Sequence, residues 1–399
     1  MVQNHKLIAI VHEHRWNLDG SSWGGFSVYP SNLRAKMFSE YSQDSFSQLV
    51  VAGDLLMSNP HFAQIRNSFL LKGFRRISNS RIRHKIDLEI AEKAIEILNS
   101  YDSKRPSIIY HVMNCFELPR PEFFKLAEEF NIILVTTLVD LQDFTLPENF
   151  SSKSLTSRRL AYEVNLRNAA RLLSISEFLV SEAEDKLGIS NALITHTSLG
   201  VDHISGNLIG QDIRNQIPFD EKYILFPAKA WKHKGHLEYI RAYLASDHSY
   251  KTIFVGDVSS IKSSIEKISH NSKVAKDCLF LNYVSDGQMR FLMANSAAVV
   301  LPSSYEGFGL PYMEAALLGI PVVGMQNNAI LELLGVEGSA IAEVGNFPQI
   351  VALCAQAIIE PDMRKITNAQ KKASDYTWSR AAARTLSGYS LALNSARER

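Results

Sequence analysis

Residues 301–325 read LPSSYEGFGLPYMEAALLGIPVVGM, a pattern that predicts part of a parallel α/β sheet. The apolar run Ala297–Leu301 predicts a buried strand, and Ile320–Val323 predicts a second one. Between them, Pro311 suits the first position of a helix, and Gly319 suits the position just after its end. Strand, glycine loop, short helix and strand together form the crossover unit of a parallel sheet.

Two carboxylates flank the glycine loop, Glu306 within it and Glu314 in what the pattern predicts to be the first helical turn. A helix N-terminus carries free N–H groups and partial positive charge, so it attracts anions such as phosphate. Carboxylates accept hydrogen bonds from hydroxyls, which sugars and ribose carry in number. Either glutamate alone could be a helix-dipole partner or a solvated loop residue. Combined with Gly307, Gly309 and the proline, the pair favours a ligand site.

The segment SYEGFGLPYMEAALLGIPVV resembles the E-x7-E segment of retaining GT-B glycosyltransferases of family 4, often called glycosyl transferases group 1. Both glutamates, the intervening G-F-G-L-P and the trailing G-x-P-V-V match. The resemblance implies that Glu306 contacts the transferred sugar and that Glu314 binds the ribose of a nucleotide. The loop residues it implies to hold sugar or phosphate are Gly307, Phe308, Gly309 and Leu310.

The resemblance also implies a GT-B fold, two Rossmann-like doubly wound α/β domains that face a cleft. Alternating strand-like and helix-like segments along the whole chain favour the same architecture. The polar stretch Val201–Phe219 separates two halves, which we expect over residues 1–205 and 206–376. The resemblance implies that the first is the acceptor-side domain and that the second binds the nucleotide sugar. The resemblance implies that the amphipathic segment Trp378–Leu393, within residues 377–399, crosses back onto the N-terminal domain.

The apolar runs predict the individual strands and helices. The predicted strands are Leu7–Val11, Gln48–Ala52, Ile108–Val112, Ile132–Leu138, Leu172–Ile175, Tyr223–Pro227, Thr252–Val255, Leu279–Leu281, Ala297–Leu301 and Ile320–Val323. The predicted helices are Asp87–Asn99, Glu122–Glu129, Glu177–Leu187, Gly235–Ala245, Asp286–Asn295, Pro311–Leu318, Phe347–Ile358 and Trp378–Leu393.

The bulk composition is that of an ordinary globular protein. The chain has 399 residues, 46% hydrophobic and 21% charged, with a formal net charge of +1. This balance argues against a nucleic-acid binder, which would be clearly basic. No apolar run approaches the ~18 residues that a membrane span needs, and the N-terminus lacks a secretory-signal pattern. The three cysteines are widely spaced, which indicates reduced core thiols and a cytoplasmic location.

A loop rich in lysine, FPAKAWKHKGH at residues 226–236, follows a predicted strand and precedes a predicted helix. Fixed cations at such a place can stabilise the charge that develops on a departing diphosphate, although solvated surface lysines give the same pattern. The family commonly has an R-x4-K pair here that contacts the diphosphate. Lys234 matches its lysine. Lys229 replaces the usual arginine, which keeps the charge but loses the bidentate geometry.

The segment TTLVDLQDFTLPEN, residues 136–149, resembles the family's H-D-L-Q segment. Asp140 matches the aspartate, and Leu141 and Gln142 match the next two positions. Val139 occupies the position of a histidine that is thought to contact the donor sugar near the reacting centre. Either the donor does not need that contact, or activity is reduced or lost. A non-catalytic partner that binds and regulates an active glycosyltransferase is therefore an alternative, which the intact glutamate pair opposes.

Three further segments of the sequence resemble features of the family. Gly24 and Gly25 look like its Gly-Gly pair, which brings backbone amides near the donor phosphate. Tyr283 stands where family members contact the nucleotide base, although a core or rim tyrosine would fit as well. Ser176 matches the family's S-E-F segment, although a helix N-cap serine is an adequate explanation.

No metal and no other cofactor is predicted. The chain has no D-x-D motif, the usual carboxylate pair for a nucleotide-bridging metal, and lysines with helix dipoles can neutralise a diphosphate instead. His12, Glu13 and His14 could ligate a metal, but no fourth ligand is identifiable.

The resemblance implies a metal-independent retaining hexosyltransferase whose donor is a nucleotide-diphospho-sugar, GDP-mannose or similar. The implied acceptor is a growing bacterial surface glycan on a lipid carrier, such as O-antigen or capsule. The segment Arg66–Lys85 has seven lysines and arginines and no acidic residue. It could contact the inner face of an anionic membrane peripherally, or it could be a solvated basic face.

Overall fold

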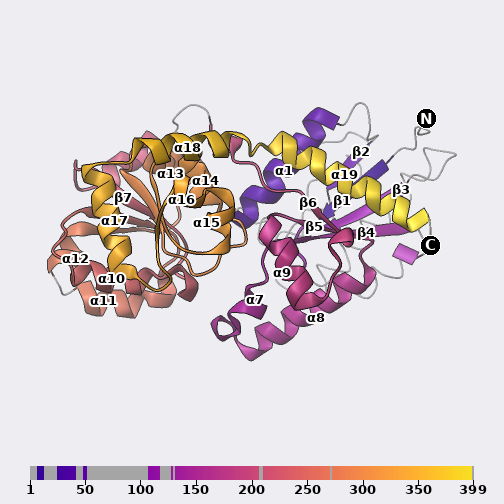
Figure 1. Ribbon diagram of the computed structural model, residues 1–399, viewed down its shortest axis with the longest axis horizontal. Helices are drawn as coiled ribbons and strands as arrows, with labels where there is room; N and C mark the ends of the chain where they lie inside the picture. The colour runs from indigo at the N-terminus through magenta and orange to yellow at the C-terminus, as the bar shows by residue number, and fades with distance from the viewer. Residues whose placement is uncertain are drawn as a thin grey trace, which may run out of the picture.

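The computed structural model describes residues 7–12, 25–41, 48–51, 107–116, 127–128, 131–205, 210–269 and 272–397. These residues form two lobes, each built on a parallel sheet (Figure 1). Sheet A has the strand order β2-β1-β3-β4-β5-β6, and sheet B has the order β12-β11-β10-β7-β8-β9. In each sheet the first strand has neighbours on both sides, so the order reverses beside it, between β1 and β3 and between β7 and β10. Ligands of open α/β sheets bind outside the carboxyl ends of the strands at such reversal points.

Sheet A is covered by helices of the N-terminal half and by the C-terminal helix (Figure 1). Its strands are β1 (Leu7–His12), β2 (Gln48–Val51), β3 (Ser107–Val112), β4 (Ile132–Leu138), β5 (Arg171–Ser174) and β6 (Ile194–His196). The helices around it are α1 (Gly25–Tyr41), α7 (Gln142–Thr145), α8 (Ser152–Asn168), α9 (Glu177–Leu187) and α19 (Trp378–Arg397). Short 3-10 turns in this half are Pro147–Asn149, Asn191–Leu193 and Asp202–Ile204.

Sheet B and its helices make up the other lobe. Its strands are β7 (Tyr223–Pro227), β8 (Lys251–Val255), β9 (Cys278–Leu281), β10 (Ala298–Leu301), β11 (Val322–Met325) and β12 (Ala340–Ala342). Its helices are α10 (His236–Leu244), α11 (Lys262–Ser269), α12 (Ser272–Asp277), α13 (Asp286–Ala294), α14 (Leu310–Leu317), α15 (Asn328–Leu333), α16 (Gly335–Gly338), α17 (Phe347–Ile359) and α18 (Met363–Ser374). Its 3-10 turns are Gln211–Gln216, Lys232–Lys234 and Ser259–Ile261.

The core of sheet B is continuous because helices cover both faces. Every residue of β7 and β10 is buried, as expected of strands with two covered faces. Phe226, Phe254 and Phe280 lie opposite one another on three neighbouring strands. Their rings are 5.3 Å and 4.8 Å apart between centroids, so aromatic contacts join β7, β8 and β9.

The strand predicted at Ile320–Val323 begins later than predicted. β11 starts at Val322 because Ile320 donates its N–H to the Ala315 carbonyl at 2.9 Å, which completes the end of α14. Gly319, with φ +72°, takes the left-handed conformation that ends the helix, as its position predicts.

The C-terminal helix α19 packs against α1 and sheet A, which confirms the predicted crossover (Figure 1). Its first residue, Trp378, is buried and stacks on Tyr29 of α1. Further along, the hydroxyl of Tyr389 lies 2.8 Å from Nδ1 of the buried His111, whose Nε2 lies 2.7 Å from the Thr137 hydroxyl. This buried polar network joins α19 to β3 and β4. The domain limits at residues 205 and 376 stay a prediction.

Acidification is expected to destabilise this network. Burial lowers the pKa of His111 from 6.5 to about 3. Between these two pH values the unfolded chain binds a proton at His111 that the folded chain does not. The free energy of unfolding therefore falls below pH 6.5 by about 1.4 kcal/mol per pH unit because of this group, and above pH 6.5 the group causes no loss. The free energy of unfolding can be measured by urea denaturation at several pH values between about 6 and about 4. Its decline per pH unit should be smaller by about 1.4 kcal/mol in His111→Gln than in the wild type. The control is His248→Gln, at an exposed histidine. Equal slopes in His111→Gln and wild type would contradict the prediction.

Candidate active site

The carboxyl ends of β7 and β10 bring together two loops that lie far apart in the sequence. The strands pair directly, with Val299 opposite Leu225. The Ser304 N–H donates to the His233 carbonyl at 2.9 Å, which holds the loop after β10 against the loop after β7. Across this junction, Lys234 Nζ lies 2.5 Å from Glu306 Oε1. The two side chains are only 13% and 11% exposed, so a cation and an anion face each other in a secluded place.

The positive charge of this loop comes from its lysines. Burial and the neighbouring Lys234 ammonium lower the pKa of His233 to about 3, so its ring is neutral near pH 7. Lys229 lies on the same loop, with Nζ 3.4 Å from Asp257 Oδ2 and 5.7 Å from the centre of the Trp231 ring. Lys229 therefore contacts the loop after β8, whereas Lys234 contacts the loop after β10.

The glycine loop leads directly into α14. Gly309 has φ +86°, a conformation in which the ring of Tyr312 would lie only 2.5 Å from an added Cβ. Glycine is therefore required at this N-cap position. The helix begins at Leu310, so Glu314 lies in its second turn, and the prediction of the first turn was wrong by about one position. Its Oε1 lies 3.1 Å from Nε2 of His203, on the segment that joins the lobes.

The N-terminal lobe holds the glycine loop from the opposite side. A Cβ on Gly307 would lie 1.9 Å from the Val139 carbonyl oxygen and 3.5 Å from the Asp140 Cβ. The Ser176 hydroxyl donates to the Gly307 carbonyl at 2.8 Å. Ser176 does occupy the N-cap position of α9, but its hydroxyl does not cap the helix as the sequence suggested. Instead, Glu332 of the other lobe accepts the first N–H groups of α9 at 2.9 Å and 2.8 Å.

Tyr305 makes a further contact between the lobes that the sequence analysis did not single out. Its hydroxyl accepts the Leu141 N–H at 2.8 Å and donates to Glu182 Oε2 at 2.7 Å. Burial, with the Glu182 carboxylate nearby, raises the pKa of Tyr305 well above its ordinary value, so the donor proton stays in place. These hydrogen bonds therefore connect the loop after β10 with the loop after β4 on the other lobe.

Asp140 lies beside the glycine loop and is held by an arginine from α8. Arg158 Nη2 lies 2.7 Å from Asp140 Oδ1 and 3.2 Å from Asp143 Oδ1. The Arg158 guanidinium also lies 3.8 Å from the centre of the Phe116 ring, which limits its movement. Burial raises the pKa of Asp140, and the Arg158 charge opposes that shift. Nothing in the local sequence singled out Arg158 as a partner. The Val139 side chain packs into the apolar core.

The remaining predicted donor residues occupy different environments. Phe308 and Leu310 are buried, and Phe308 meets the Tyr376 ring edge-to-face. Tyr283 lies after β9 and is 53% exposed. Gly25 is the first residue of α1. Gly24 and the segment Arg66–Lys85 lie outside the described residues.

The part of the chain that the structure describes has neither a cluster of metal-ligand side chains nor a membrane-spanning helix. Those residues contain no group of three or more histidine, cysteine, aspartate or glutamate side chains placed to share a metal ion. No helix among them combines the length and hydropathy needed to cross a bilayer.

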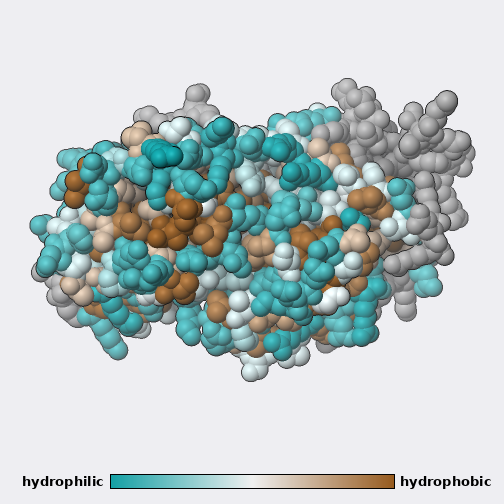
Figure 2. Space-filling model, in the orientation of Figure 1, coloured by the Kyte–Doolittle hydropathy of each residue, from teal (hydrophilic) through white to brown (hydrophobic). Residues whose placement is uncertain are grey.

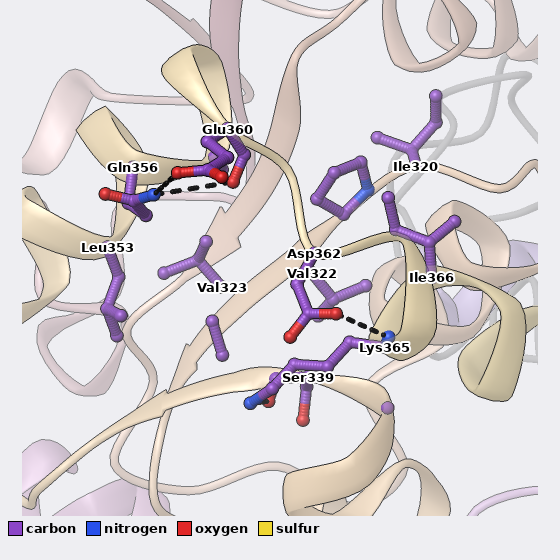
Figure 3. Close-up of a pocket in the computed structure, with 14 residues that line it drawn as sticks. Ile320, Val322, Val323, Ser339, Leu353, Gln356, Glu360, Asp362, Lys365 and Ile366 are labelled. Atoms are coloured by element: carbon purple, nitrogen blue, oxygen red, sulfur yellow. Dashed lines mark hydrogen bonds between the residues drawn. The ribbon is translucent and has the colours of Figure 1, made fainter.

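A cavity of about 170 Å³ lies elsewhere, against the amino ends of β11 and β12 (Figure 3). Its wall is mostly apolar, and its charged members include Asp362, which caps α18 by accepting the Lys365 N–H at 3.1 Å. Glu306 and Lys234 follow the carboxyl ends of their strands. The cavity is therefore at the other edge of the sheet and is not part of the candidate site.

The face seen in Figure 2 is mainly hydrophilic, with hydrophobic patches on both lobes.

Residues 211–373, which contain both lysines and both glutamates, match the family described as "Glycosyl transferases group 1". The second lobe of the chain thus matches the glycosyltransferases of this group. The chain is 26% identical over 276 residues to O-antigen chain mannosyltransferase B of Escherichia coli, and the match covers 64% of this chain and 70% of that protein.

Solved structures show that the chain has the GT-B fold, as predicted. A glycosyltransferase from Rickettsia africae ESF-5 is similar with a TM-score of 0.67 and 16% identity, over 98% of this chain and 99% of the other. Anabaena Alr3699/HepE in complex with UDP-glucose is similar with a TM-score of 0.63 and 18% identity, over 96% and 100% of the two chains.

Proposed function

We propose that this glycosyltransferase transfers mannose, with retention of configuration, from GDP-mannose to a growing bacterial surface glycan such as O-antigen. The observation that carries the proposal is the junction of Lys234, Glu306 and the Gly307 backbone at the reversal point of sheet B, where loops of the N-terminal lobe face it. Such junctions are the usual ligand sites of open α/β sheets.

The diphosphate is proposed to lie against Lys229, Lys234 and the first turn of α14. Two ammonium groups and the helix N-terminus place positive charge where the leaving group gains negative charge. No metal is needed for that role. Lys234 already has an anionic partner in Glu306, so the donor would insert its diphosphate and sugar beside an organised ion pair.

The two glutamates are proposed to bind hydroxyl groups, Glu306 those of the sugar and Glu314 those of the ribose. Asp140, next to Gly307 on the facing lobe, would lie on the acceptor side of the transferred sugar. We propose that the leaving phosphate departs from the face on which the acceptor attacks and takes up the acceptor proton. This route needs no carboxylate on the far face of the sugar.

The choice of mannose and of an O-antigen-like acceptor is supported by the Escherichia coli relative, which is named an O-antigen chain mannosyltransferase. UDP-glucose belongs in any test because a protein of similar fold was solved with it. A cytoplasmic location and a peripheral membrane contact through Arg66–Lys85 stay predictions from the sequence.

A panel of nucleotide sugars tests the proposal. Incubation with GDP-mannose, UDP-glucose and related donors should give release of GDP from GDP-mannose and an α-linked product on a lipid-linked glycan acceptor, unchanged by EDTA. A β-linked product or inhibition by EDTA would contradict the mechanism. Binding of donors without transfer or hydrolysis of any of them would favour the non-catalytic partner subunit instead.

A further inference from the structure

His203 lies between the proposed ribose-binding glutamate and the start of the crossover helix. Its Nε2 is 3.1 Å from Glu314 Oε1, and its Nδ1 is 3.1 Å from Nε1 of Trp378. The His203 and Glu314 side chains are only 16% and 11% exposed. The imidazole therefore bridges a carboxylate of α14 and an indole of α19.

The chemistry of these partners fixes the proton on the ring. An indole N–H can only donate, so Nδ1 of His203 must be the acceptor in this contact. In the neutral imidazole the single N–H is then on Nε2, and it donates to Glu314. One carboxylate oxygen is thereby engaged, and a ligand hydroxyl would be received by the other.

The position of the ring is restrained from several sides. Arg290 donates to the His203 carbonyl at 3.0 Å. The Trp378 backbone N–H donates to Asp202 Oδ1 at 2.7 Å, next to His203 in the chain. Trp378 itself is 1% exposed and stacks on Tyr29 of α1. A side chain that is held so firmly can in turn hold the carboxylate that it contacts.

We propose that His203 is a positioning residue that orients Glu314 to receive the ribose hydroxyls of the donor. The proposal rests on the proposed function, because it needs Glu314 to bind ribose. Its distinguishing consequence is selectivity: loss of His203 weakens only the part of nucleotide binding that depends on the ribose hydroxyls. A purely structural role between the lobes would affect ligands with and without these hydroxyls equally.

The test is the affinity of GDP and of 2′,3′-dideoxy-GDP, with UDP and its dideoxy form in parallel, measured by titration calorimetry. His203→Ala should weaken binding of the ribonucleotide about tenfold, because Glu314 loses the hydrogen bond from His203 that orients its carboxylate. Binding of the dideoxy nucleotide should be unchanged. His203→Gln should restore most of the affinity, because its side-chain amide can donate in place of Nε2. His248→Ala is the matched control.

The outcomes separate this inference from the proposed function. If Glu314→Gln leaves the ratio of the two affinities unchanged, Glu314 does not bind ribose and the proposed donor site is wrong. If Glu314→Gln changes the ratio but His203→Ala does not, or weakens both ligands equally, the positioning role is wrong. Should His203→Ala fail to fold, Trp378→Phe removes the donor that fixes the tautomer, and a change in the same ratio is again expected.

Discussion

Replacement of Lys234 by alanine is expected to lower kcat by about a hundred- to a thousandfold, the range found when one electrostatic contact to a transition state is removed. Its ammonium group lies 2.5 Å from Glu306, and the Lys234 side chain is only 13% exposed. Water in the variant would therefore substitute poorly for the lost positive charge. The substitution also leaves the Glu306 carboxylate without its cation at the point where the diphosphate is proposed to bind.

The measurement is the steady-state rate of GDP release from GDP-mannose, alongside thermal unfolding to exclude loss of the fold. Lys232→Ala is the matched control, because it removes the same charge from the same loop at an exposed position. A Lys234→Ala enzyme whose kcat stays within about threefold of the wild type would rule out the assigned role.

Gly307→Ala is expected to lower kcat/KM by about a hundredfold with a small effect on stability. An added Cβ would lie 1.9 Å from the Val139 carbonyl oxygen, so the glycine loop must move away from the N-terminal lobe. A displacement of about 1 Å at a catalytic loop can cost that much activity. The same displacement would lengthen the hydrogen bond from Ser176 to the Gly307 carbonyl.

The control for this substitution is Gly338→Ala, where the nearest atoms to an added Cβ are 3.4 Å away. Kinetics with the donor at several concentrations and thermal unfolding should be compared for the two variants. If Gly307→Ala retains wild-type activity, the contact between the glycine loop and the N-terminal lobe does not shape the active site.

Elements with strong apolar runs could be predicted from the sequence. β4, β7 and α9 have the predicted limits, because apolar runs and turn residues mark both of their ends. The strands β6 and β12 were missed because three residues are too few to show a period. α8 was missed because it buries few side chains, so its sequence shows no apolar stripe.

The candidate site could be predicted only where its residues share one local motif. Glu306 and the glycine loop follow from a single stretch, and the lysines follow from another. The contacts that Tyr305 and Ser176 make with the opposite lobe span more than a hundred positions of sequence. Arg158 carries no local signal, since its role depends on α8 packing over the loop after β4. Such contacts depend on the arrangement of the two lobes in the folded chain, so no local sequence pattern predicts them.

The most direct test of the proposed donor site is a crystal structure of the enzyme with GDP-mannose. Density for the diphosphate is expected within hydrogen-bond distance of Lys234 and the first turn of α14, with ribose at Glu314 and the sugar at Glu306. Density for the nucleotide at any other place, such as the cavity beside Asp362 and Lys365, would contradict it.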